Sequence, residues 1–369
     1  MSYLRNMDAH PKTLVIRFSS IGDIVLSTPL LRVLRKRFPK SQIDYVTRRE
    51  YAELVKSNHN INLTYEFDAS EGFAGLRKLK NTIRRENYQL IVDIHDSLRS
   101  KFLRSLRGPD KIVTINKRVI ERTMLVKLKK NIYKNVVSVA DRYIEPLREF
   151  GIEPDGRGPE LHIPDETLFG VSGKIARLKL NHFEKVLGLC PGARHKTKRW
   201  PMERFADVST RFAREFHGFV MIFGGSADME LASEIARRIE AAVGADRVKV
   251  FCGELALLET AAAMEYCDLI VTNDSGLMHM AAAMRKKLVA IFGSTVREFG
   301  FFPYGDESVV IEQNGLTCRP CSHIGRRECP EGHFRCMLDT TADQVYGAVR
   351  ASVTAAQKAP TREWTSSGR

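Results

Sequence analysis

The sequence predicts two α/β domains, each built around a doubly wound parallel sheet. Apolar, β-branched runs alternate with stretches of helical spacing along most of the 369 residues. This length is enough for two domains of ~100–200 residues each. A segment rich in Gly and Pro, residues 151–165, interrupts the alternation and is typical of a linker. With 43% hydrophobic and 28% charged residues the composition is that of a globular protein, and no apolar run approaches the ~20 residues of a membrane span.

In the N-terminal half we expect strands at 12–18, 42–47 and 89–95 because these runs are apolar and β-branched. A helix is predicted over 24–38, where Ile24, Leu30, Leu31 and Leu34 recur at helical spacing. Another helix is expected from Asp141 to about Phe150. These elements define a predicted first domain at residues 1–155.

The alternation is more regular in the C-terminal half, which we predict to be a second domain at residues 156–339. The predicted strands and helices, in order, are strand 186–190, helix 202–216, strand 219–225, helix 226–243, strand 248–253, helix 259–267, strand 268–274, helix 276–284 and strand 287–295. Short turns containing Gly at the strand ends favour a parallel sheet. A C-terminal helix is expected at 340–356, and the tail 357–369 is expected to be disordered.

The chain has a net charge of +14, and the excess is concentrated between Ser97 and Asn135. Twelve Lys or Arg residues and two acidic residues in that stretch leave a local charge of +10. Solvated helix faces would account for single lysines, but a cluster of this size favours an anionic partner. Nucleic acid, lipid head groups and a phosphorylated glycolipid all fit. The sparse aromatic residues, Phe102 and Tyr133, do not form the stacking surface of a single-strand binder.

Ligands of parallel sheets bind at the carboxyl ends of the strands, so the turns after the strands are the candidate site. The first of these turns, Ser19 to Asp23, lacks the dinucleotide-binding fingerprint. Two hypotheses fit Asp23. It is either the N-cap of the following helix, or a carboxylate that faces the cleft and serves as a general base.

A second turn, Pro191 to Pro201, follows the strand that ends at Cys190 and predicts a phosphate site. Gly192 and Ala193 leave backbone N–H groups accessible, and four cations occupy the next six residues: Arg194, Lys196, Lys198 and Arg199. Such a loop suits a diphosphate. The alternative is a basic surface loop.

Two further turns offer polar groups. Asp274, Ser275 and Gly276 begin a predicted helix whose N-terminus would attract an anion, and His279 lies one turn further on. The turn at 223–230 supplies carboxylates, Glu230 among them, that could hold a ribose.

Four of the seven cysteines form a cluster at 318–336. Cys318, Cys321, Cys329 and Cys336 have spacing compatible with a structural Zn²⁺, and reduced, packed cysteines are the equally favoured alternative, with disulfides third. The odd number and uneven spacing of cysteines favour a reducing, cytoplasmic compartment.

The motifs S-S-I-G-D, P-G-A with K-x-W-P, and D-S-G-L-M-H-M-A-A-A, in this order, resemble the heptosyltransferases of lipopolysaccharide core assembly, glycosyltransferase family 9. The resemblance runs from about Lys12 to Asp339. It implies the GT-B architecture, in which two Rossmann-like domains face a cleft. It also implies inverting transfer of heptose from ADP-heptose to a lipid-A-linked inner-core acceptor, with no cofactor required for catalysis.

The resemblance also implies roles for residues. Asp23 matches the proposed catalytic base. The remaining matches concern the donor: Lys198, Gly192, Ala193, Asp274, Ser275, Gly276 and His279, with Glu230 as a counterpart of a ribose-binding carboxylate. We expect the anionic glycolipid acceptor to meet Arg99, Lys101 and Arg104 in the N-terminal domain.

Three alternatives remain open. A family member could use another nucleotide sugar, an inactive module could only bind one, and a basic nucleic-acid-binding protein could combine the cluster with a zinc knuckle. The third makes no use of the D-S-G-x-x-H turn, so we expect no nucleic-acid partner. We expect a cytoplasmic protein, with peripheral attachment to the inner membrane as an open question.

Overall fold

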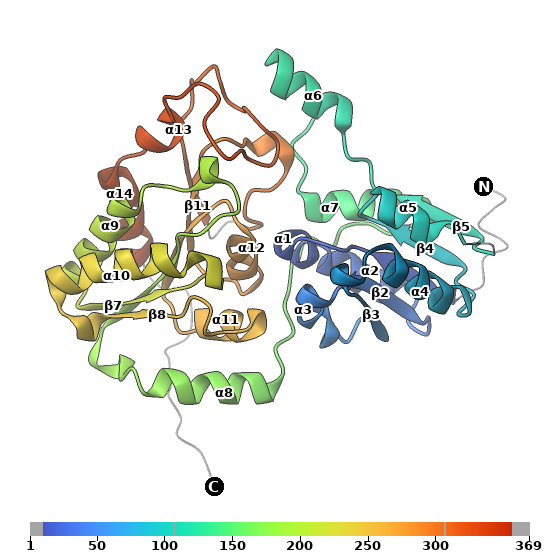
Figure 1. Ribbon diagram of the computed structural model, residues 1–369, viewed down its shortest axis with the longest axis horizontal. Coiled ribbons are helices and arrows are strands. Elements are labelled where there is room, and N and C mark those ends of the chain that lie inside the picture. Colours follow the sequence, from blue (N-terminus) through green and yellow to red (C-terminus); the bar gives the residue numbers. More distant parts are fainter. Residues whose placement is uncertain (1–9, 107, 306–307, 356–369) are drawn as a thin grey trace, which may run out of the picture.

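The computed structural model describes residues 10–106, 108–305 and 308–355, which form two lobes with one parallel sheet each (Figure 1). Helices pack around both sheets, and the lobes meet along one side of each. The tail at 357–369 lies outside the described residues.

The N-terminal lobe contains a five-stranded parallel sheet of order β3-β2-β1-β4-β5. Its strands are β1 (Thr13–Ile16), β2 (Ile43–Arg48), β3 (Leu63–Phe67), β4 (Leu90–Asp93) and β5 (Lys111–Thr114). Its helices are α1 (Ile21–Val25), α2 (Thr28–Arg37), α3 (Glu53–Lys56), α4 (Gly72–Arg84), α5 (Leu98–Arg104), α6 (Val119–Leu128) and α7 (Val139–Ile144).

The C-terminal lobe contains a six-stranded parallel sheet of order β11-β10-β9-β6-β7-β8. Its strands are β6 (Lys185–Cys190), β7 (Gly218–Ile222), β8 (Val248–Val250), β9 (Leu269–Asn273), β10 (Leu288–Phe292) and β11 (Ser308–Glu312). Its helices are α8 (Asp165–Ala176), α9 (Met202–Glu215), α10 (Met229–Val243), α11 (Leu257–Met264), α12 (Gly276–Ala283), α13 (Arg335–Leu338) and α14 (Ala342–Thr354).

The predicted helix over 24–38 is two helices. Ser27 is the N-cap of α2, and Pro29 stands in its first turn. Proline has no N–H and its ring clashes with the preceding turn, so a continuous helix cannot pass through this position. The chain therefore breaks between α1 and α2, and α1 becomes a short element that can turn toward the other lobe.

In each sheet the strand order changes direction at one point, and the candidate turns lie at that point. In the N-terminal sheet the order reverses between β1 and β4, and in the C-terminal sheet between β6 and β9. Crevices at such points are the usual ligand sites of open parallel sheets. Asp23 follows β1, Lys198 follows β6, and Asp274 follows β9.

The lobes touch through α1 and α12, and two glycines permit this contact. A Cβ on Gly22 would lie 2.6 Å from Cδ2 of His279, and one on Gly276 would lie 2.8 Å from Cβ of Ile21. Both distances are too short for real atoms, so the helices can approach this closely only with glycine at these positions. We refer to this as the α1–α12 contact.

Apolar packing continues across the α1–α12 contact. The core of the N-terminal lobe includes Leu258 of α11 and Met280 of α12, both buried. Glu53 of α3 adds a polar link, since its carboxylate accepts hydrogen bonds from the backbone N–H groups of Leu257 and Leu258 at the start of α11 (3.1 Å each). A carboxylate at a helix N-terminus is stabilised by the exposed N–H groups and by the dipole.

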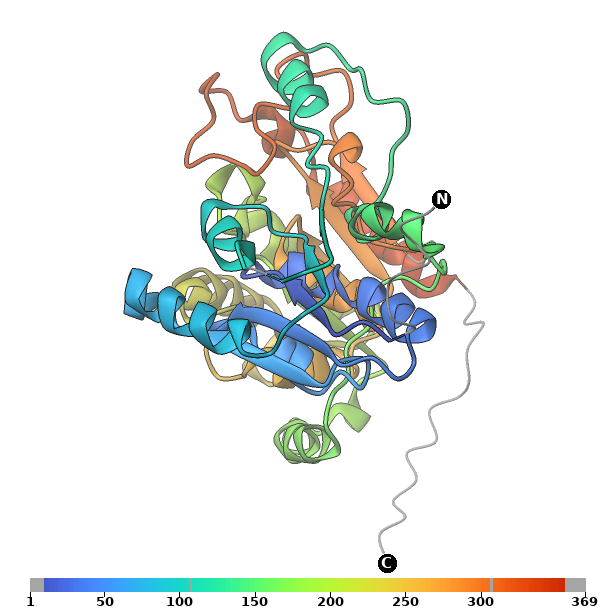
Figure 2. The same cartoon turned by 90° about the vertical axis from the view of Figure 1, so that its right-hand side faces the viewer.

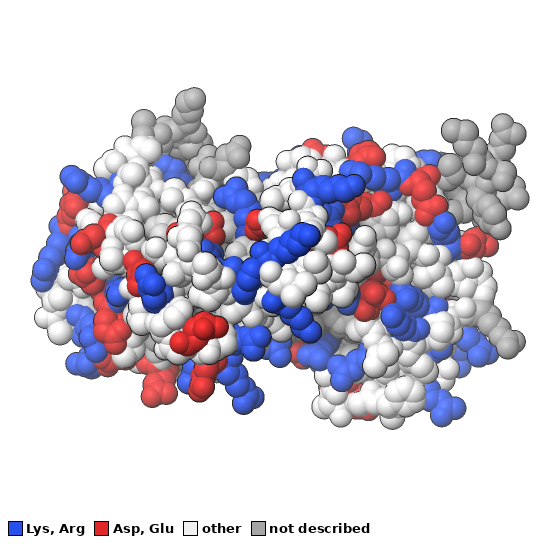
Figure 3. All heavy atoms as spheres, turned by 90° about the horizontal axis from the view of Figure 1, so that it is seen from above, with Lys and Arg blue, Asp and Glu red and all other residues white. Residues whose placement is uncertain are grey.

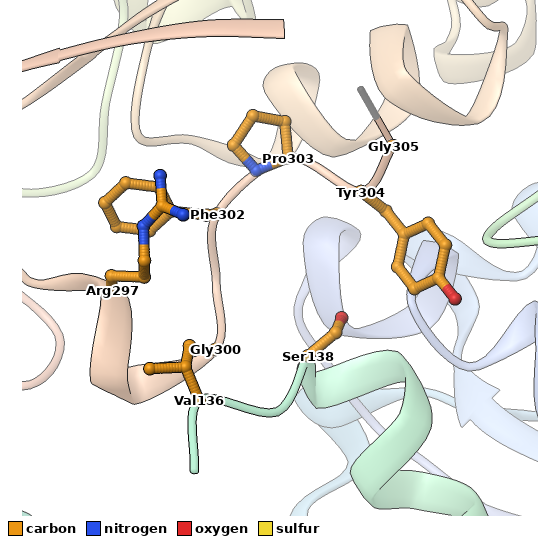
Figure 4. Close-up of a pocket in the computed structure, with 8 residues that line it drawn as sticks. All are labelled: Val136, Ser138, Arg297, Gly300, Phe302, Pro303, Tyr304 and Gly305. Carbon is orange, nitrogen blue, oxygen red and sulfur yellow. The ribbon is translucent and has the colours of Figure 1, made fainter. Parts of the chain in front are cut away.

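A second contact between the lobes lies beside α7. The N–H of Val139 donates to the carbonyl of Gly300 (2.9 Å), and Nζ of Lys129 donates to the carbonyls of Cys318 and Pro320 (2.9 and 2.7 Å). A pocket of about 190 Å³ opens here (Figure 4), lined by Val136, Ser138, Arg297, Gly300, Phe302, Pro303, Tyr304 and Gly305. None of the predicted site residues lines this pocket.

Among the helices that the structure describes, none is long and apolar enough to cross a bilayer.

Candidate functional site

Asp23 lies in the first turn of α1, at its third position. Ser20 is the N-cap, and its backbone N–H and hydroxyl both donate to Oδ2 of Asp23 (3.1 and 2.9 Å). The N-cap interpretation of Asp23 is therefore wrong: Asp23 is the carboxylate of a capping box, three residues further on. This position turns its other oxygen, Oδ1, away from Ser20.

Oδ1 of Asp23 has two partners from other elements. Nη2 of Arg17, just after β1, lies 2.6 Å away, and the Tyr143 hydroxyl of α7 donates from 3.0 Å. Burial raises the pKa of Asp23, but the Arg17 charge and the Ser20 hydrogen bonds outweigh it and hold the pKa below its ordinary value. Asp23 is thus ionised at neutral pH, as a proton acceptor must be.

These contacts also occupy all the lone-pair sites of the Asp23 carboxylate. Two oxygens offer about four lone-pair sites, and Asp23 already accepts from Arg17, from Tyr143 and twice from Ser20. A substrate hydroxyl that gives its proton to Asp23 must therefore displace one donor or share its site. The Tyr143 and Ser20 hydroxyls are the neutral donors, and displacing either costs less than separating the Arg17 ion pair.

Lys198 and Asp274 form an ion pair on the C-terminal lobe. Nζ of Lys198 lies 2.6 Å from Oδ2 of Asp274, and the Thr295 hydroxyl donates to the same oxygen (2.6 Å). The two side chains are 14% and 4% exposed. The pair fixes the Lys198 ammonium beside the N-terminus of α12, and an ammonium group has further N–H bonds with which to bind an anion.

His279 and Ser275 provide the unsatisfied polar groups of the site. Nδ1 of His279 and Oγ of Ser275 are buried and have no hydrogen-bond partner. Burial lowers the pKa of His279 to about 4, although the charges of Asp274 and Asp23 oppose the shift; the Lys198 charge adds a smaller decrease. His279 is therefore neutral at pH 7. Buried polar atoms without partners are costly, so these two point to a ligand that pairs with them.

The turn after β6 lies against that after β7. A Cβ on Gly192 would lie 2.5 Å from the carboxyl carbon of Asp228, and Nη2 of Arg199 lies 3.7 Å from Oδ1 of Asp228. Ala193 is buried, and its carbonyl accepts from Nε of Arg199 (2.7 Å). Of the two carboxylates at the end of the 223–230 turn, Asp228 is therefore the one that lies against the predicted donor loop, whereas Glu230 is exposed on α10.

The three predicted acceptor residues lie on α5 but differ in their surroundings. Arg104 pairs with the buried Asp93 (3.0 Å) and with Asp96 (3.4 Å), so its charge is largely balanced by carboxylates of the same lobe. Lys101 lies 3.7 Å from Asp96 and is half exposed. Arg99 is exposed. Arg99 and Lys101 therefore remain available to an external anion.

The structure corrects the zinc hypothesis for Cys318, Cys321, Cys329 and Cys336. All four are free thiols in the chain leading from β11 through α13. Over residues 10–106, 108–305 and 308–355, no three His, Cys, Asp or Glu side chains gather in a way that could hold a metal ion. Cys336 is buried, and burial raises its pKa to about 11. A structural zinc is not supported.

Four residues of this arrangement are not among those predicted from the sequence: Arg17, Tyr143, Asp228 and Thr295. Arg17 is a charged residue directly after an apolar strand, and Thr295 lies in the turn after β10, so both carried a signal. Asp228 lay within the turn from which Glu230 was chosen. Tyr143 had no local signal, because its contact with Asp23 spans 120 positions.

Comparison with known proteins gives a family for most of the chain. The family described as "Glycosyltransferase family 9 (heptosyltransferase)" matches residues 76–332. The lipooligosaccharide heptosyltransferase 2 of Campylobacter jejuni is 28% identical over 327 residues, which cover 88% of this chain and 93% of that protein.

Solved structures share the fold. A glycosyltransferase family 9 protein from Veillonella parvula superposes with a TM-score of 0.79 at 23% identity, covering 94% of this chain and 98% of that one. The ADP-heptose lipopolysaccharide heptosyltransferase II of Escherichia coli superposes with a TM-score of 0.69 at 22% identity, covering 93% and 98%. These likenesses confirm the GT-B fold class predicted from the sequence.

Proposed function

Because the chain belongs to glycosyltransferase family 9, we propose that this glycosyltransferase moves heptose from ADP-heptose to a lipid-A-linked inner-core acceptor, with inversion at the anomeric carbon. The names of its relatives support the donor and the pathway, since both the Campylobacter jejuni and the Escherichia coli proteins are named as heptosyltransferases of lipooligosaccharide or lipopolysaccharide. The motifs of the three donor turns support the same assignment.

One observation carries the proposal: the α1–α12 contact brings a carboxylate of one lobe to the anion-binding turn of the other. Gly22, next to Asp23, lies against His279, and His279 shares its turn with Ser275 and Asp274. A base and a phosphate site at one interface are what transfer from a diphospho-sugar needs. The nucleic-acid alternative has no use for this arrangement and is not favoured.

In the proposed reaction Asp23 accepts the proton of the acceptor hydroxyl while that oxygen attacks the anomeric carbon. The new bond forms on the face opposite the leaving group, and the bond from the anomeric carbon to the phosphate oxygen breaks. Its electron pair leaves with ADP. Lys198 and the N-terminus of α12 stabilise the negative charge that develops on the diphosphate.

The other donor residues have supporting roles in this proposal. The N–H groups of Gly192, Ala193 and Gly276 meet phosphate oxygens, and Ser275 and His279 pair with the donor through their unsatisfied atoms. We keep Glu230 as the proposed ribose ligand, with Asp228 as a second candidate because of its place beside Gly192. We propose domain limits of 1–155 and 156–339, and catalysis that requires no cofactor.

Calorimetric titration of the purified protein with ADP and with UDP tests the donor assignment. We expect ADP to bind and UDP to bind at least about tenfold more weakly, since only an adenine-selective site suits ADP-heptose. Equal affinity for the two nucleotides, or preference for UDP, would favour a family member that uses another sugar.

For the acceptor, we propose that Arg99 and Lys101 bind phosphates of the glycolipid, with Arg104 holding α5 in place through Asp93. The double variant Arg99→Gln/Lys101→Gln should raise the acceptor KM about five- to thirtyfold, the effect of two exposed ion pairs, and leave the ADP affinity unchanged. Steady-state kinetics with acceptor, together with ADP titration, measure this.

The matched control is Arg84→Gln/Arg85→Gln, which removes two exposed charges from the same lobe. These residues precede β4 and so lie at the amino edge of the sheet, away from the candidate turns. The control should leave the acceptor KM unchanged. An unaltered KM in the Arg99/Lys101 variant, or an equal loss of ADP affinity, would contradict the acceptor assignment.

A further inference from the structure

Helix α6 and the chain that follows it, residues 119–136, stand apart from both sheets; we call them the α6 segment. In two perpendicular views α6 lies at the top of the molecule, next to the loop between β11 and α13 (Figures 1 and 2). Within α6, Leu125 is the one residue that the structure buries. The helix therefore leaves most of its surface uncovered.

The uncovered side of α6 carries large apolar side chains, contrary to the usual arrangement. Ile120, Met124 and Leu128 are spaced four apart and so share one face of the helix. Ile120 is 72% exposed and Leu128 is 66% exposed. Surface helices normally bury their apolar face and expose the polar one. Beyond the helix the exposure of apolar side chains continues at Ile132 and Val136.

Cations surround these apolar side chains. Lys127, Lys130 and Lys134 are exposed, and no ion pair or side-chain hydrogen bond engages them in the described part of the chain. Glu121 is the only acidic residue between positions 119 and 136. Figure 3 looks down on this end of the molecule and shows Lys and Arg side chains across the middle of the face, next to uncharged surface.

Helix α8 shows that exposed apolar residues alone do not make such a surface. Helix α8 exposes Leu168 and Phe169 by 40% and 82%. However, α8 begins with Asp165 and Glu166 and carries one lysine, Lys174, which pairs with Glu259 (2.7 Å). Unlike α8, the α6 segment combines exposed apolar side chains with lysines that form no ion pair with the described residues.

We propose that the α6 segment docks the protein on an anionic lipid bilayer. Apolar side chains enter the boundary between headgroups and acyl chains, while lysines keep their ammonium groups at the level of the lipid phosphates. A polybasic surface and inserted apolar residues together bind more strongly than either alone. Charge complementarity selects a membrane as the occupant, because a protein partner for an apolar face does not require free cations around it.

The α6 segment is connected to both lobes of the molecule. The segment leads directly into α7, whose Tyr143 donates to Asp23, and Lys129 ties it to the other lobe. A bilayer bound here would lie beside the contact between the two lobes that Lys129 and Val139 make with Cys318 and Gly300. Docking does not depend on which sugar is transferred, so it can fail or hold independently of the proposed function.

The test is flotation of the purified protein with vesicles of phosphatidylcholine alone and of phosphatidylcholine mixed with phosphatidylglycerol. We expect binding to the mixed vesicles, little binding to the neutral ones, and release as salt rises. Ile120→Ser/Leu128→Ser should bind the mixed vesicles about tenfold or more weakly, since two apolar side chains lose their insertion. Lys127→Gln/Lys130→Gln should bind roughly thirtyfold more weakly, the effect of two cations near an anionic surface.

The matched control is Leu168→Ser/Phe169→Ser on α8, which should bind like the wild type. Three outcomes would overturn the proposal. The wild type does not bind the mixed vesicles, Ile120→Ser/Leu128→Ser binds them as tightly as the wild type, or the α8 control loses as much binding as the α6 variants. A wild-type dimer that Ile120→Ser/Leu128→Ser converts to a monomer, without vesicle binding, would instead assign the face to a second copy of the chain.

Discussion

Replacing Asp23 with Asn should lower kcat by about 10²–10⁴-fold, the contribution typical of a general base. The variant should still fold, because the Asn side-chain oxygen can accept the Ser20 hydrogen bonds of the capping box. It should bind ADP as the wild type does, since the donor turns belong to the other lobe. Turnover with acceptor, ADP titration and thermal unfolding of the same preparation measure the three quantities.

The chain offers a closely matched control for the lost ion pair. Asp155 pairs with Arg32 at 2.7 Å, with side chains 18% and 10% exposed, much as Asp23 pairs with Arg17 at 2.6 Å, with 17% and 12%. Asp155→Asn should therefore cost similar stability and leave kcat within a few-fold of the wild type. Near-normal kcat in a folded Asp23→Asn variant would show that the base lies elsewhere.

Replacing Lys198 with Ala should weaken ADP binding about 10–150-fold, which corresponds to the loss of one or two hydrogen bonds from a charged donor. The variant also leaves Asp274 buried with Thr295 as its remaining partner, so thermal stability should fall. Lys198→Gln separates the two effects, because a carboxamide can still donate to Asp274 but carries no charge for the diphosphate. Both variants should lose ADP affinity, and Lys198→Gln should be the more stable.

Lys196 provides the control for this prediction. It occupies the same turn, two residues before Lys198, and its side chain is exposed. Lys196→Ala should bind ADP with an affinity within about threefold of the wild type, as expected for an exposed surface charge. If Lys198→Ala and Lys196→Ala had equal ADP affinities, the ammonium that meets the diphosphate would have to be another one.

The central strands could be predicted from the sequence, whereas of the four edge strands only β8 coincides with a predicted strand, at 248–253. β1, β4, β6, β7, β9 and β10 are mostly apolar, since strands in the middle of a parallel sheet are covered on both faces. β3 and β5 lie at the two edges of their sheet and mix polar with apolar residues, because one side of each strand meets solvent. The sequence patterns of β3 and β5 therefore cannot be distinguished from those of loops.

The site could likewise be predicted only in part: single residues show a local pattern, but their partners do not. Asp23, Lys198 and His279 lie within eight residues of the ends of apolar strands, in the turns or first helical turns that follow them, which is a local pattern. The partners that give them their properties come from distant parts of the chain: Tyr143 meets Asp23 across 120 positions, and Asp274 meets Lys198 across the sheet between β6 and β9. A pattern within one segment carries no information about such neighbours.

The α1–α12 contact also determines how the lobes can move. At each glycine one side chain of the opposite lobe, His279 or Ile21, lies directly against the backbone, so this contact would be the pivot if one lobe rotated about it against the other. Displacement in a rotation grows with distance from the pivot. Gly22 and His279, at the pivot itself, would barely shift, while the outer ends of the lobes would swing through a wide arc. A rotation about this contact would therefore change the separation of Asp23 from the donor turn less than that of residues at the outer ends of the lobes.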